Sequence, residues 1–72
     1  MKYKVIFGRE LLGTISLSSN NKFIIKADNE RNSSRIKNFI KHTINENESP
    51  EKFLHLAPFR FNGYVRVVNA RS

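Results

Sequence analysis

Polar and apolar residues alternate along the first third of the chain with the period of two that is typical of a half-buried β-strand. Val5 and Phe7 lie on one side of the first such segment, and Lys2 and Lys4 lie on the other. Gly13 interrupts the second segment and predicts a β-bulge, because an isolated glycine in a strand pattern often marks one. We therefore expect an antiparallel meander of three strands, at residues 2–7, 11–18 and 23–27.

In the middle of the chain the apolar residues recur with the spacing of an α-helix. Ile36, Phe39 and Ile40 fall on one helical stripe, and Ile44 extends it. The polar run at residues 45–48 is expected to end this helix. Several residues can serve as its N-cap, so its start is open over several positions: Asp28, Asn29, Ser33 and Ser34.

The last third of the chain carries signals for a short helix followed by a hairpin. Ser49 and Pro50, followed by an acidic residue, are typical of a helix start, and Pro58 is expected to stop this helix. Asn62-Gly63 is the preferred pair for a two-residue type I′ turn. It predicts a β-hairpin whose strands are residues 59–61 and 64–68.

The predicted fold is α+β, with the element order β-β-β-α-(α)-β-β in a single domain over residues 1–72. A small antiparallel sheet, made of the N-terminal meander and the C-terminal hairpin, packs against one main helix and a short second helical turn. The chain has no cysteine, so neither a disulfide nor a thiolate zinc site can add to its stability. An apolar core or a partner must supply that stability.

The charge balance is strongly basic and indicates the sign of a partner. Thirteen lysines and arginines against six acidic residues give a formal net charge of +7, which attracts nucleic acid or an acidic protein surface. No apolar run approaches the roughly 18–20 residues that cross a bilayer, and the N-terminal apolar run is too short for a signal peptide. We expect a cytoplasmic monomer or homodimer that does not enter a membrane.

The reactive side chains argue against an enzyme. The three glycines cannot form a phosphate-binding or dinucleotide motif, and no cysteine nucleophile is present. His42 and His55 lack metal-ligand spacing, while Glu46, Glu48 and Glu51 lack the ligand spacing of a calcium loop. We expect no catalytic residue, no metal site and no cofactor.

The main helix carries charge of one sign away from its apolar stripe. Lys37 and Lys41 repel each other at the i,i+4 spacing, which favours a surface for a polyanion, although exposed cations are also ordinary on a solvated helix. The candidate phosphate-binding residues lie on this helix and on the predicted sheet: Arg31, Arg35, Lys37, Lys41, Lys22, Lys26, Arg60 and Arg66.

The predicted hairpin offers a second candidate surface. Phe59, Phe61 and Tyr64 would share one of its faces, with Val65 and Val67 on the other. If the aromatic face is exposed, its rings can stack on single-stranded nucleic acid or anchor a protein partner. If it is buried, the rings belong to the core, as phenylalanine usually does. The sequence leaves open which face is buried.

Two functions of different class follow from these patterns. The first is a small non-catalytic module that binds nucleic acid by phosphate contacts. The second is a small protein-interaction module that docks on an acidic partner, as a subunit of a complex or as an inhibitor of the kind that mobile elements encode. The sequence distinguishes neither DNA from RNA nor one partner from another.

Overall fold

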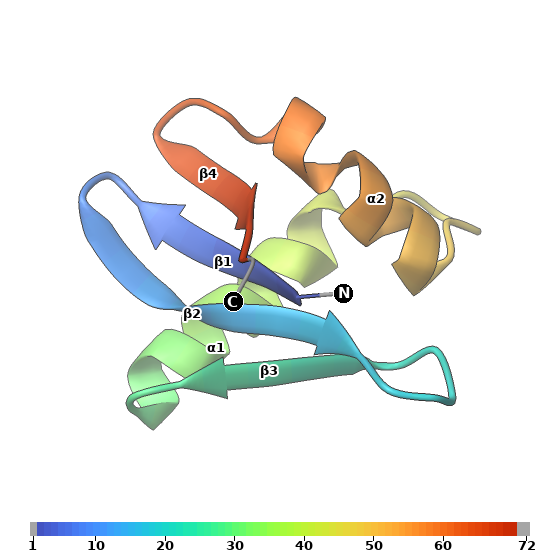
Figure 1. Cartoon of the computed structure of the whole chain (residues 1–72), viewed down its shortest axis with the longest axis horizontal. Helices are drawn as coiled ribbons and strands as arrows, with labels where there is room; N and C mark the ends of the chain where they lie inside the picture. The colour runs from blue at the N-terminus through green and yellow to red at the C-terminus, as the bar shows by residue number, and fades with distance from the viewer. Residues whose placement is uncertain (1, 71–72) are drawn as a thin grey trace.

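Four antiparallel strands form one sheet with the order β3-β2-β1-β4. The structure is a computed structural model that describes residues 2–70, and the predicted α+β class is confirmed. Figure 1 shows β1 and β2 at the centre of the sheet, flanked by β3 and β4. The elements along the chain are β1 (Lys2–Phe7), β2 (Glu10–Leu17), β3 (Phe23–Ala27), α1 (Glu30–Thr43), α2 (Pro50–Arg60) and β4 (Val65–Asn69).

Both helices pack against the same face of the sheet. The helix α1 contacts β2 and β3, and α2 contacts β4; α1 lies behind β2 and β3 in the view of Figure 1. Alternate strand residues point toward the helices and form the core with them. The buried apolar residues are Tyr3, Val5, Leu12, Ile15, Ile36, Ile40, Phe53, Leu54, Ala57 and Val67.

A β-bulge in β2 confirms the interruption that the sequence predicts. Val5 pairs with Gly13 and Ile6 pairs with Leu11, so Leu12 is the extra residue. The bulge turns Leu12 into the core, where it is 1% exposed, and leaves Leu11 on the opposite face. Without the extra residue, the alternation of the strand would move one of these two leucines to the other face of the sheet.

Side-chain caps fix the start of both helices. Asn29 Oδ1 accepts a hydrogen bond of 2.8 Å from the backbone N–H of Asn32, which resolves the open start of α1. Ser49 Oγ accepts one of 3.1 Å from the backbone N–H of Lys52, with Pro50 as the first helical residue. The predicted start of the second helix is therefore confirmed.

A chain of five phenylalanine rings connects the sheet to both helices. Phe7 lies 6.1 Å from Phe39, and Phe39 lies 4.7 Å from Phe61, measured between ring centroids. Phe61 is 5.9 Å from Phe53, which is 5.8 Å from Phe23. Edge-to-face pairs at such distances stabilise a core beyond the area that they bury.

The predicted C-terminal hairpin is wrong. The helix α2 continues through Pro58 to Arg60, so Phe59 lies in its last turn and not in a strand. Neither Asn62 nor Gly63 has the positive φ that a type I′ turn requires. A single bridge between Asn62 and Arg66 is all that links this segment to β4 by strand pairing.

Tertiary contacts explain why α2 passes the proline that was expected to end it. The backbone N–H of Phe61 donates to the carbonyl of Ala57 at 2.9 Å, and the ring of Phe61 is anchored between Phe39 and Phe53. Packing of this kind overrides the local preference of the residue before a proline.

The close approach of β3 and α1 to Gly13 makes this glycine necessary. An added Cβ would overlap the carbonyl oxygen of Lys26 and lie 3.0 Å from Cδ1 of Ile36. We expect Gly13→Ala to lower the free energy of unfolding by at least about 2 kcal/mol, because backbone must move to accept the methyl group. Urea denaturation measures this loss.

Gly63→Ala is the matched control, because nothing lies within 4 Å of a Cβ at Gly63. This substitution should change the free energy of unfolding by no more than about 0.5 kcal/mol. Equal stabilities of the two variants would contradict the close packing of β2 against β3 and α1.

Candidate nucleic-acid interface

The face of the sheet that turns away from the helices carries exposed cations. We call it the open face. Lys4 pairs with Thr14, and Thr14 pairs with Lys26, so the two lysines lie on either side of one threonine. The strand positions of this face hold no acidic residue; they are Lys2, Lys4, Ile6, Leu11, Thr14, Ser16, Ile24, Lys26, Arg66 and Val68.

Aliphatic side chains lie between these cations. Leu11 is 52% exposed and Ile24 is 38% exposed, and Ile6 pairs with both Leu11 and Arg66. Sheet faces in which cations alternate with exposed aliphatic groups offer two kinds of contact, to charge and to apolar surface. The open face therefore presents both kinds of contact on one side of the sheet.

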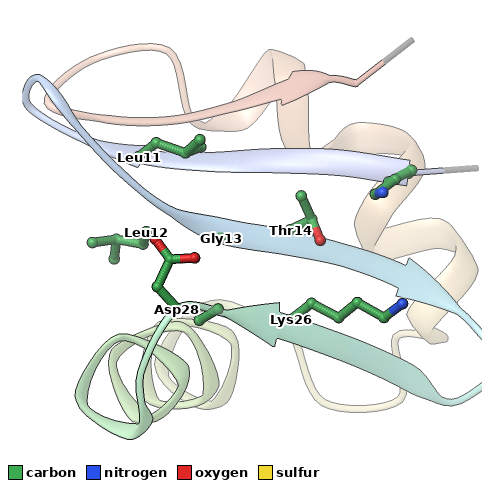
Figure 2. Close-up of a pocket in the computed structure, with 8 residues that line it drawn as sticks. Leu11, Leu12, Gly13, Thr14, Lys26 and Asp28 are labelled. Carbon is green, nitrogen blue, oxygen red and sulfur yellow. The ribbon is translucent and has the colours of Figure 1, made fainter. Parts of the chain in front are cut away.

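A shallow hollow of about 300 Å³ lies along β2 and β3. Figure 2 shows Thr14 and Lys26 side by side on these strands, with Asp28 at the end of β3 where the chain enters α1. Asp28 is the carboxylate among the lining residues. It partly offsets the positive charge at this end and leaves the centre of the face positive. The lining residues are Lys2, Leu11, Leu12, Gly13, Thr14, Lys26, Ala27 and Asp28.

The predicted cations of α1 do not form one surface with those of the sheet. Arg31, Lys37 and Lys41 are exposed, whereas Ile36 and Ile40 are buried against the sheet. The exposed side of α1 therefore points away from the open face. The structure divides the predicted set between two sides of the molecule, and Lys22 lies apart from both, exposed in the turn that joins β2 and β3.

Arg35 has a structural role that its place in the basic run of α1 did not reveal. Its Nη1 lies 3.5 Å from Oε1 of Glu10 and 3.2 Å from Oδ1 of the buried Asn32. Its guanidinium carbon lies 5.0 Å from the centroid of the Phe7 ring, in reach of a cation–π contact. These contacts hold α1 against the turn between β1 and β2.

Arg60 is also engaged within the protein. Its Nη2 lies 2.8 Å from Oε2 of Glu48, which ties the end of α2 to the loop that precedes it. The hydrogen bond from Arg60 lowers the pKa of Glu48 below its ordinary value of 4.5 and raises the pKa of Arg60. Arg60 Nη1 also donates to Oε1 of Glu48 at 2.9 Å, and such a bidentate arginine–carboxylate pair is stronger than a single contact.

The three aromatic candidates have three different environments. Phe61 is half-buried in the ring chain of the core. Tyr64 is 74% exposed, but its ring lies 6.5 Å from that of Phe7 and its carbonyl accepts a 2.7 Å hydrogen bond from Gly8. Phe59 is 76% exposed on α2. The structure therefore does not bring the three rings together on one hairpin face.

Lys2 and Lys4 are the two cations of the open face that the sequence did not identify as candidate phosphate-binding residues. The signal for them was present, because the alternation that places Tyr3 and Val5 in the core places these lysines on the other face. The sequence did not reveal which face of the sheet the helices would cover.

Other candidate chemistry is sparse in the described part of the chain. No group of three histidine, aspartate or glutamate side chains within residues 2–70 is arranged to hold a metal ion. Neither α1 nor α2 has the length and apolar character needed to cross a membrane. No protein-family model, curated protein or solved structure matches this chain.

The ion pair between Glu48 and Arg60 predicts a pH dependence of stability. Because the folded state lowers the pKa of Glu48, the pair stabilises the fold above pH 4.5 and is lost as the pH falls through the lowered pKa. Urea denaturation should show that the stability difference between the wild type and Glu48→Gln shrinks between about pH 6 and about pH 3. A difference that stays constant over this range would exclude the pair as its cause.

Phe61 and Phe59 form a matched pair for testing which aromatic ring belongs to the core. Phe61→Ala should lower the free energy of unfolding by about 3 kcal/mol, because it removes the ring that joins Phe39 to Phe53. Phe59→Ala should change it by no more than about 0.5 kcal/mol. Thermal denaturation followed by circular dichroism compares them; similar losses in both variants would contradict these placements.

Proposed function

We propose that the protein is a non-catalytic module that binds nucleic acid through phosphate contacts. The observation that supports this most directly is the supply of cations that the fold does not use. The ion pairs within residues 2–70 engage Arg35 and Arg60. The remaining lysines and arginines of that segment have no carboxylate partner and are free to meet phosphates.

The physical basis of this binding is the release of counterions. A nucleic acid holds a condensed layer of cations, and each protein cation that replaces one of them gains entropy for the released ion. A chain of 72 residues with a net charge of +7 has enough cations to release several counterions. An acidic protein surface carries a lower and less regular charge density, so it gains less from the same cations.

The affinity for nucleic acid should fall steeply with salt. If four phosphates of a single strand are neutralised, log K falls with log salt at a slope of about −2.8, or about −3.6 for a duplex. Fluorescence anisotropy with labelled 20-nucleotide single strands and 20-base-pair duplexes between about 50 and 200 mM KCl measures the slope.

Polyglutamate of similar length is the control for charge alone. It should compete for the protein much more weakly than an unlabelled oligonucleotide at the same concentration of negative charge. An affinity for both nucleic acids that stays flat across salt, or equal competition by polyglutamate, would remove the proposed function in favour of an acidic protein partner.

A second candidate function is a protein-interaction module, and one observation favours it. Phe59 exposes 76% of its surface on α2 with His55 one turn before it, also exposed. An exposed aromatic ring on a rigid helix is a frequent anchor in protein interfaces. A protein that fails the salt titration but needs Phe59 to bind an acidic polypeptide would belong to this class.

A further inference from the structure

On the open face of the sheet, the charges and the shape of the surface favour the same class of ligand. We propose that this face binds single-stranded nucleic acid, with Lys2, Lys4, Lys26 and Arg66 on its phosphates and aliphatic side chains on the faces of its bases. The inference rests on the proposed function and adds to it the surface and the class of nucleic acid.

The spacing of the cations suits an extended chain of phosphates. Lys2 and Lys4 are two positions apart on β1, which separates their backbones by roughly 7 Å. Lys4 and Lys26 lie two strands apart, at roughly 10 Å. Long flexible side chains cover the differences between these spacings. A single strand crossing the face meets cations on three of the four strands.

The width of the face argues against a duplex. Four strands at about 4.8 Å span roughly 14 Å between the outer backbones before side chains are added. The major groove of B-form DNA is only about 12 Å wide and admits a helix or a two-stranded ribbon. The major groove of an RNA helix is narrower still. The face is therefore too wide to enter the major groove of either duplex.

The aliphatic side chains favour the ligand that exposes its bases. In a duplex the flat faces of the bases are stacked away from solvent, so Leu11 and Ile24 would find no apolar partner there. In a single strand these faces are accessible and can cover both side chains. Because apolar contacts to the flat faces of bases do not read the hydrogen-bonding groups on their edges, we expect little preference among bases.

The test compares two variants that each lose two positive charges from exposed positions. Lys4→Thr with Lys26→Thr alters the open face and keeps residues that suit a strand. Lys37→Gln with Lys41→Gln alters the exposed side of α1 and keeps residues that suit a helix. The probes are a labelled 12-nucleotide oligothymidylate and a 12-base-pair duplex, and circular dichroism verifies that each variant is folded.

The expected results follow from counting phosphates. The salt slope for oligothymidylate should be about −2.8 for the wild type and about −1.4 for the variant of the open face. It should stay at the wild-type value for the variant of α1. If the double variant of the open face does not fold, Lys26→Thr alone should give about −2.1. At about 100 mM KCl the single strand should bind more tightly than the duplex, because only the single strand exposes base faces to the aliphatic side chains.

A third variant tests the apolar contact separately from the charge. Ile24→Thr should weaken binding of oligothymidylate by about fourfold at every salt concentration without changing the slope. An unchanged affinity would overturn the contact between aliphatic side chains and bases.

The outcomes separate this inference from the proposed function. If the salt slope becomes shallower for the α1 variant but not for the open-face variant, the inference is overturned and nucleic-acid binding remains in place. Duplex binding as tight as that of the single strand would overturn the class of ligand. Binding of neither probe would overturn the inference and the proposed function together.

Discussion

The packing of both helices on one face of the sheet is the constraint on which the rest of the molecule depends. Ile36 from α1 and Phe53 from α2 are fully buried, and they meet the strand residues Val5, Ile15 and Val67 in one cluster. A chain of 72 residues has too few apolar side chains for a second core. Within residues 2–70 the opposite face of the sheet is therefore left uncovered, and its polar and aliphatic residues are available to a ligand.

This arrangement also decides where the positive charge acts. On the helix side, Glu10 pairs with Arg35 and ties β2 to α1, while Glu48 pairs with Arg60 and ties the loop before α2 to the end of that helix. The strand positions that point to the open face have no carboxylate to do the same. Part of the cation supply is thus used for the fold, and the exposed remainder is divided between the open face and the outer side of α1.

Local patterns predicted most of the elements, and they failed where tertiary contacts decide. The alternation around Val5, the glycine of the bulge and the Ser49-Pro50 helix start each have a local cause, and the structure has all three. The conformation of the segment after Pro58 depends on a tertiary contact instead. Asn62-Gly63 favours a turn and Pro58 disfavours a helix, but the burial of Phe61 against α1 outweighs both preferences. No spacing within the sequence reveals that contact in advance.

The candidate site was harder to predict than the fold, because a surface depends on which side of the sheet is covered. The basic run of α1 is continuous in sequence, yet Arg35 turns inward to Glu10 and Phe7. The cations of the open face come from β1, β3 and β4, which are far apart in sequence, and the pairing of β1 with β2 and β4 and of β2 with β3 brings them together. On β1 the odd positions build the core and the even positions build the surface. The alternation of a strand therefore separates stability from binding. A substitution at Lys4 can alter what the open face binds without disturbing the packing of Val5 in the core.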